Sequence, residues 1–96
     1  MADVTVAAGG IGTPEIVLSP GQVYTVEFAE DVPAVEVVVS ACTSPVWWTC
    51  DGSTPAPGTG YYVPAPGIDE REPPMGGPSV VKLVSSSAAT LRVQRT

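Results

Sequence analysis

The chain has 96 residues, which make one domain with a thin hydrophobic core, because small domains bury a smaller share of their surface than large ones. Only four residues are basic and the net charge is −6, a balance that argues against nucleic acid and anionic membranes as partners. The absence of histidine removes the commonest general base and the commonest metal ligand.

The N-terminal third alternates apolar and polar residues with a period of two, which predicts short strands at "DVTVAA" and "EIVLS". Ser19-Pro20-Gly21 is typical of a turn. Glycines and a proline interrupt the pattern between the two segments, so residues 1–15 are also predicted to form an extended N-terminal arm. The start "MADVTVAAGG" lacks the basic and long apolar regions of a signal peptide, which indicates synthesis in the cytoplasm.

Two central segments, "QVYTVEF" and "AVEVVVSA", predict strands with one apolar face each. The residues predicted to face inward are Tyr24, Val26, Phe28, Val35, Val37 and Val39. A third segment, "VWWTC", follows a turn at residues 43–45. The last two, "SVVKLVSS" and "ATLRVQR", are separated by residues 85–89, a spacing that predicts a hairpin.

The complete pattern predicts an all-β fold of six or seven short strands, with turn signals about every ten residues. Eleven prolines and ten glycines leave no room for a long helix. We therefore expect a single domain over residues 1–96 that is a small antiparallel β-sandwich, either immunoglobulin-like or jelly-roll-like, with a long Pro/Gly-rich loop.

That loop is predicted over residues 51–78, which hold seven of the eleven prolines. Within it, "GYYVPAP" is expected to be an edge strand, because proline cannot sit in a central strand. "GIDEREPPMGGP" is expected to be an exposed loop. Loops of this length in compact domains are usually functional or contacted by a partner.

The aromatic residues gather beside this loop. Trp47 and Trp48 are adjacent, so they must point to opposite faces of their strand. Trp48 shares its parity with Val46 and is predicted to lie in the core. Trp47 is then on the outer face near Tyr61 or Tyr62, where it resembles an interface anchor. The alternative, that the loop folds back and covers Trp47, remains open.

Three acidic residues in the loop, Asp69, Glu70 and Glu72, have two interpretations. They either complement basic groups on a partner protein or form the solvated tip of a loop. Asp51-Gly52 favours a turn over a calcium or sugar contact, because no spaced set of further carboxylates accompanies it.

Cys42 and Cys50 bracket a turn and are candidates for a disulfide, but a tight hairpin would not bring them opposite one another, and cytoplasmic synthesis favours free thiols. Two cysteines without histidine cannot complete a zinc site, so no metal and no cofactor are expected. No catalytic residue is identified either, and the chain is not expected to be an enzyme.

Residues 34–93 resemble small virion proteins of tailed phages that infect actinobacteria. The resemblance rests on a "VEV" strand, an aromatic strand ending in "DGSTP", a "YVPA" segment and a closing "VVKLVSSSAAT". "DGSTP" alone is weak, because it also occurs in immunoglobulin-like accessory domains of chitin-degrading enzymes. The insertion "GIDEREPPMGG" and the two cysteines depart from the pattern.

The resemblance implies a bacteriophage structural protein that decorates the capsid. It would bind the outer face of the major capsid protein shell as a homo-oligomer on the lattice and stabilise it. Its location would be the capsid surface of a virion assembled in the host bacterial cytoplasm, with no nucleic-acid or membrane partner. Two alternatives are a phage tail or head-tail connector component, and a carbohydrate-binding surface module for host attachment.

Overall fold

The computed structural model describes residues 3–74 and 79–95, and it contains strands and no helix in those ranges. The strands are β1 (Val4–Val6), β2 (Ile16–Leu18), β3 (Tyr24–Phe28), β4 (Val35–Cys42), β5 (Val46–Thr49), β6 (Tyr61–Val63), β7 (Gly67–Arg71), β8 (Ser79–Ser85) and β9 (Ala89–Arg95). The all-β prediction is confirmed.

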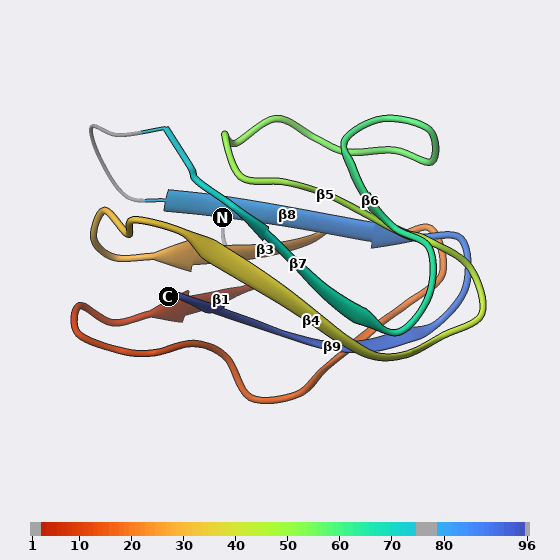
Figure 1. The fold of residues 1–96 in the computed structure, drawn as a ribbon, viewed down its shortest axis with the longest axis horizontal. Helices are drawn as coiled ribbons and strands as arrows, with labels where there is room; N and C mark the ends of the chain where they lie inside the picture. The colour runs from red at the N-terminus through yellow and green to blue at the C-terminus, as the bar shows by residue number, and fades with distance from the viewer. Residues whose placement is uncertain (1–2, 75–78, 96) are drawn as a thin grey trace.

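The strands form two sheets that pack as a sandwich (Figure 1). Sheet A has the order β1-β3-β8-β5-β6, and sheet B has the order β2-β9-β4-β7. All neighbours are antiparallel except β1 and β3, which run parallel. Successive strands alternate between the sheets, except that β5 and β6 are neighbours in sheet A. This alternation is the jelly-roll arrangement, one of the two predicted alternatives.

Three predictions about the strands were wrong. The described part of the chain holds nine strands instead of six or seven. Residues 67–71 form β7, although they were predicted to be loop, because an edge strand exposed on both faces shows no apolar alternation. β8 and β9 do not form a hairpin, because β8 lies in sheet A and β9 in sheet B. The three residues between them are enough to cross the gap of about 10 Å between packed sheets.

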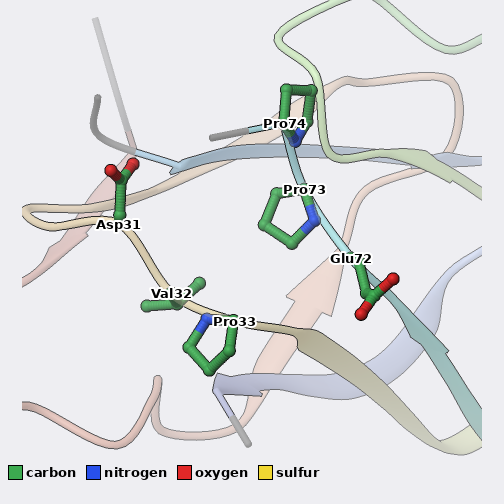
Figure 2. Close-up of a pocket in the computed structure, with 6 residues that line it drawn as sticks. All are labelled: Asp31, Val32, Pro33, Glu72, Pro73 and Pro74. Carbon is green, nitrogen blue, oxygen red and sulfur yellow. The ribbon is translucent and has the colours of Figure 1, made fainter. Parts of the chain in front are cut away.

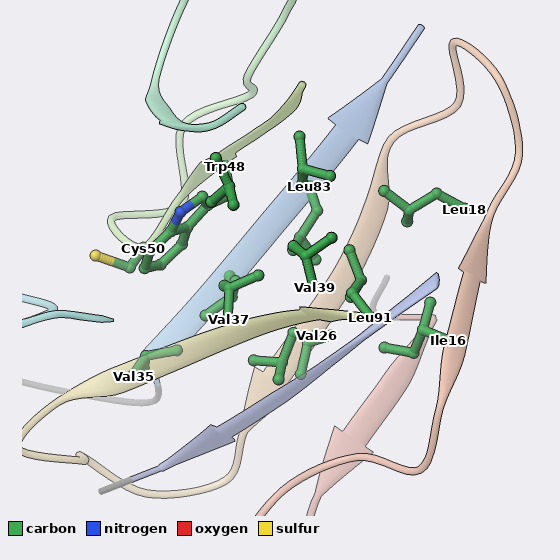
Figure 3. Close-up of a cluster of buried hydrophobic side chains, with 14 of the residues drawn as sticks. Ile16, Leu18, Val26, Val35, Val37, Val39, Trp48, Cys50, Leu83 and Leu91 are labelled. Atoms are coloured by element: carbon green, nitrogen blue, oxygen red, sulfur yellow. The ribbon is translucent and has the colours of Figure 1, made fainter. Parts of the chain in front are cut away.

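The core lies between the inward faces of the sheets and is rich in valine (Figure 3). The predicted inward residues of β4 are buried, and so are Val26 and Phe28 of β3, with Tyr24 packed at the margin of the core. Trp48 is 0% exposed, which confirms its predicted place. β6 lies at the edge of sheet A, as the prolines of its segment predicted.

Residues 7–15, part of the predicted N-terminal arm, lie against the sandwich. Gly12 bridges to Gln94 of β9. The N–H of Thr13 donates to the carbonyl of Val93 at 2.8 Å, and the N–H of Arg95 donates to the carbonyl of Ile11 at 2.7 Å. The chain before β2 thus continues the pairing with β9. Residues 1–2 of the predicted arm and 75–78 of the predicted loop lie outside the described ranges.

Candidate protein-binding edge

The predicted site residues gather on one side of the sandwich, which we call the β6–β7 edge. It consists of β6, the edge strand of sheet A, and β7, the edge strand of sheet B, together with the neighbouring strand β5. In β5 and β6, Trp47 lies opposite Tyr62 and Trp48 lies opposite Tyr61. Because side chains alternate along a strand, these two aromatic pairs point to opposite faces of sheet A.

The outer pair is a stacked aromatic surface. The rings of Trp47 and Tyr62 are 4.7 Å apart between centroids, with an interplanar angle of 33°. Tyr62 is 50% exposed, whereas Trp47 is half-buried. On the other side of Trp47 in the register lies Val84 of β8, which is only 3% exposed although it belongs to the outer face. Tyr62, a residue of the predicted loop region, thus covers part of Trp47 and leaves a stack that faces solvent.

The inner pair belongs to a network that joins the two sheets. The indole Nε1 of Trp48 donates to Oδ2 of Asp69 in β7 at 3.0 Å, and the ring of Tyr61 meets that of Trp48 edge-on at 5.2 Å. The Arg71 guanidinium lies 4.4 Å from the centroid of Tyr61, and its Nε is 3.4 Å from the Asp69 carboxylate. Asp69 therefore satisfies a buried donor and does not stand free toward a partner.

Glu70 points the other way, to the outer face of sheet B. It lies directly opposite Glu36 of β4, so two carboxylates are cross-strand neighbours. Like charges in this position repel one another. Nε2 of Gln94 donates to Oε1 of Glu36 at 3.0 Å, but this neutral donor does not balance the charge. Ile68, two residues before Glu70 on the same face, is 66% exposed.

Glu72 lines a pocket of about 650 Å³ at the end of β7 (Figure 2). One wall comes from residues 31–33, just before β4, and the other from residues 72–74, just after β7. The two walls meet because β4 and β7 are antiparallel neighbours with Val35 opposite Arg71. Most of the lining is apolar and is provided by Val32, Pro33, Pro73 and Pro74.

A second, smaller pocket of about 220 Å³ lies between β5 and the turn after it, and Cys50 and Tyr61 are among its lining residues. Burial raises the pKa of the Cys50 thiol, which is therefore protonated at neutral pH and a weak nucleophile. The negative charge of a Cys50 thiolate raises the pKa of Tyr61. Cys42 and Cys50 are both free thiols.

The turn after β5 has the form that its sequence predicted. Oδ1 of Asp51 accepts from the N–H of Ser53 at 3.0 Å and from its hydroxyl at 2.5 Å. These bonds lower the pKa of Asp51, the hydroxyl having the larger effect. Gly52 has φ +86°, a conformation that glycine adopts without strain. No group of three or more Cys, Asp and Glu residues that suits a metal ion occurs within the described ranges.

The structure thus divides the six predicted contact residues among four places. Trp47 and Tyr62 form the outer stack, Tyr61 and Asp69 belong to the network between the sheets, Glu70 lies on the outer face of sheet B, and Glu72 lines the pocket. The sequence analysis missed Arg71 and Glu36. The shared parity of Asp69 and Arg71 would have indicated their pairing, had β7 been predicted as a strand.

No protein-family model matches this chain, and no curated protein matches it. Its structure is similar to the solution NMR structure of a de novo designed double-stranded beta-helix, with a TM-score of 0.60 and 16% sequence identity. The similarity covers 86% of this chain and 96% of the designed one. None of the described residues forms a helix that is long and apolar enough to cross a membrane. At this level of identity the comparison shows the fold alone, which is a compact two-sheet β-sandwich.

Proposed function

We propose that the chain is a structural protein of a phage virion that decorates the capsid. It binds the outer face of the major capsid protein shell and stabilises the shell by bridging neighbouring subunits, without catalysis. The resemblance to virion proteins of actinobacterial phages supports this function, and the residues that carry it lie in β4, β5, β6, β8 and β9 and the turn after β5.

The observation that carries the proposal is the Trp47–Tyr62 stack. Aromatic side chains are enriched among the residues that dominate protein–protein binding energy. Each ring holds the other in place, and the buried Val84 lies beside Trp47 in the register. Because the two rings pack against one another before a partner binds, binding restricts few additional rotamers, and more of the contact energy contributes to affinity.

The contact surface of a single chain is small, and a shell of repeating subunits can compensate for this by binding several copies at once. One stack and a few charged groups provide a modest contact area, which by itself corresponds to weak binding. A homo-oligomer that engages several capsid subunits at once gains from effective concentration, so weak contacts combine into stable attachment.

Co-sedimentation with purified shells of the phage tests the proposal. The wild-type chain should bind the shells in many copies per particle and raise the temperature at which they rupture. The Trp47→Ala/Tyr62→Ala variant should bind at least about tenfold more weakly, because hot-spot residues cost about 2 kcal/mol or more each when truncated. Val17→Ala, which removes an exposed apolar side chain in β2, is the matched control and should bind normally.

Two results would overturn the decoration function. One is a wild-type chain that stays in the supernatant, and the other is a shell that is equally heat-resistant with and without the chain. A low copy number, confined to one vertex or to the tail, would replace decoration with a connector or tail component.

One feature also fits a carbohydrate-binding module, because the exposed ring of Tyr62 offers a stacking surface for a sugar. The angle of 33° between the rings of Trp47 and Tyr62 keeps them from forming one flat platform, which favours protein as the ligand. Binding of the wild-type chain to host cell-wall polysaccharide, lost in Tyr62→Ala, would instead establish the glycan function.

A further inference from the structure

We propose that the free edge of β7 is a docking surface for a basic, extended polypeptide segment of a partner protein. The segment pairs with this edge as a fifth strand of sheet B and places Lys or Arg side chains beside Glu70 and Glu72. This inference deepens the proposed function, on which it rests only in taking the partner to be a protein.

β7 is the edge strand best suited to such pairing. It has five residues, whereas β1, β2 and β6, the other edge strands, have three each. Within residues 3–74 and 79–95, β7 is paired with β4 alone. Every second residue of an edge strand directs its N–H and C=O groups away from the sheet, so β7 offers an unpaired backbone to an incoming strand. Addition of a strand to such an edge is a common mode of peptide recognition.

The charges on β7 determine what kind of strand it accepts. Glu70 and Glu36 place two carboxylates side by side on the outer face. Arg71 does not neutralise them, because it packs over Tyr61 and contacts Asp69 instead. A strand that brings Lys or Arg beside Glu70 relieves this repulsion and forms charge-assisted hydrogen bonds. Because Ile68 lies exposed two residues earlier, the complementary strand carries an apolar residue two positions from its basic one.

A second copy of this chain fits the edge poorly. An antiparallel pair of β7 strands centred on Glu70 would put that carboxylate opposite its own copy, and a pair centred on Asp69 would do the same for Asp69. Like charges directly opposite one another are destabilising. The net charge of −6 adds to the repulsion between copies. The charges of β7 therefore disfavour pairing with a second copy of this chain and favour a basic partner.

Glu72 extends the acidic surface beyond the end of β7. It follows directly on Arg71, the last residue of the strand, and shares the parity of Glu70. Its side chain points away from the pocket wall formed by residues 31–33 (Figure 2). A strand paired with the free edge of β7 can therefore place a second Lys or Arg beside Glu72, where a charge-assisted hydrogen bond forms.

NMR titration of the ¹⁵N-labelled full chain with a ten-residue peptide, two repeats of Lys-Thr-Lys-Thr-Val, tests the inference at low salt, because one face of each repeat carries two Lys residues followed by a Val. The amide signals of Gly67–Arg71 and of Glu72 should shift, and those of β2, the edge strand on the opposite side of sheet B, should not. A peptide of the same sequence with alternate backbone nitrogens methylated keeps its charge but cannot form a ladder. It should bind at least about tenfold more weakly, because several backbone hydrogen bonds are lost.

Two sets of carboxylate variants check the role of charge. Glu70→Gln/Glu72→Gln should weaken binding of the peptide by about tenfold, since hydrogen bonds to charged groups are the strong ones. Glu15→Gln/Glu27→Gln removes the same charge from an exposed site before β2 and from the outer face of sheet A, and it should bind like the wild type. Unchanged signal dispersion of each variant establishes that it is folded.

Equal binding of the methylated peptide would overturn the inference, as would shifts at β2 in place of β7, or equal losses in both pairs of variants. The shell experiment separates this inference from the proposed function. If shells bind the chain but no basic peptide perturbs β7, the inference is wrong and decoration stands. If the peptide binds β7 but shells do not bind the chain, the docking surface stands and decoration is wrong.

Discussion

The two sides of the sandwich are closed in different ways, and the difference explains where a partner can bind. On one side lie the edge strands β1 and β2, and on the other lie β6 and β7. Backbone hydrogen bonds from residues 11–13 extend the first side along β9. At the second side, side chains connect the two sheets, and the backbone of β7 pairs only with β4 among the described residues.

The β1–β2 side is fastened at several points. Besides the backbone bonds from residues 11–13, Oε1 of Glu30 accepts from the N–H of Gly9 and from Nη1 of Arg95, both at 2.7 Å. Thr13 also accepts, through its hydroxyl, from the N–H of Val93 at 3.2 Å. These polar groups are occupied within the molecule, and the edge strands on this side, β1 and β2, have only three residues each, so this side offers a shorter edge for recognition than β7 does.

The β6–β7 edge has the opposite character. Two contacts link its sheets, namely the hydrogen bond from Trp48 to Asp69 and the cation–π contact of Arg71 with Tyr61. Side-chain links leave the outward backbone groups of an edge strand available to another chain. The molecule therefore combines a side whose edge strands are short with a side where the five residues of β7 are long enough to pair with another chain.

The largest expected effect comes from removing the residue that anchors the β6–β7 edge. Trp48→Ala should lower the free energy of unfolding by about 3–5 kcal/mol, because it leaves a cavity where a fully buried indole was. Urea denaturation followed by circular dichroism measures the loss. Trp47→Ala, in the same strand but facing outward, is the matched control. An equal loss in both variants would contradict the assignment of Trp48 to the core.

A glycine on each side allows the comparison to be tested with the same substitution. At Gly12 a Cβ atom would come unusually close to the Val93 carbonyl and to Gln94, so Gly12→Ala should cost about 1–3 kcal/mol of stability. At Gly67 in β7 the nearest atom to a new Cβ is the Ala65 carbonyl at 3.8 Å. Gly67→Ala should therefore be neutral or slightly stabilising. Thermal unfolding compares the two variants, and similar melting temperatures would contradict the close packing at Gly12.

The sequence predicted the features that depend on local alternation. The buried faces of β3 and β4, the inward position of Trp48 and the edge position of β6 all follow from period-two patterns and from proline placement. The sandwich class followed from the number of short strands. These features need no knowledge of which strands are neighbours.

What the sequence could not provide is the pairing. Backbone hydrogen bonds hold β7 to β4, and these bonds do not depend on the type of side chain. The charged segment from Gly67 to Arg71 therefore forms a strand without the alternation of apolar residues that a sequence pattern can detect. The crossing of the chain between sheets after β8 is a property of the complete topology, since a short link suits a hairpin and a jelly roll equally. The Glu36–Glu70 neighbours and the Trp48–Asp69 bond follow from that topology, and they were missed for the same reason.

The hydrogen bond between Trp48 and Asp69 should contribute less to the free energy of unfolding than the burial of the Trp48 indole does. Asp69→Ala leaves Nε1 of Trp48 without its acceptor, and we expect a loss of about 1–2 kcal/mol in the free energy of unfolding. Asp69→Asn retains an acceptor oxygen and should lose less. Glu70→Ala, in the same strand but outward, is the control. Amide hydrogen exchange should be faster in β7 of Asp69→Ala, and unchanged protection there would contradict a role in holding β7.

The smallest effect is expected at the turn that leads from β5 toward the same edge. Hydrogen bonds from Ser53 hold the pKa of Asp51 below its usual value of 3.8, so the bonded carboxylate stabilises the fold above that pH, and this stabilisation is lost as the pH falls through the folded-state pKa. Because Asp51 is exposed, the contribution is at most a few tenths of a kcal/mol. Carboxyl ¹³C titration of the wild type and of Ser53→Ala measures it directly. The pKa of Asp51 should rise in Ser53→Ala, and identical titration curves would show that the Ser53 hydroxyl does not hold the turn.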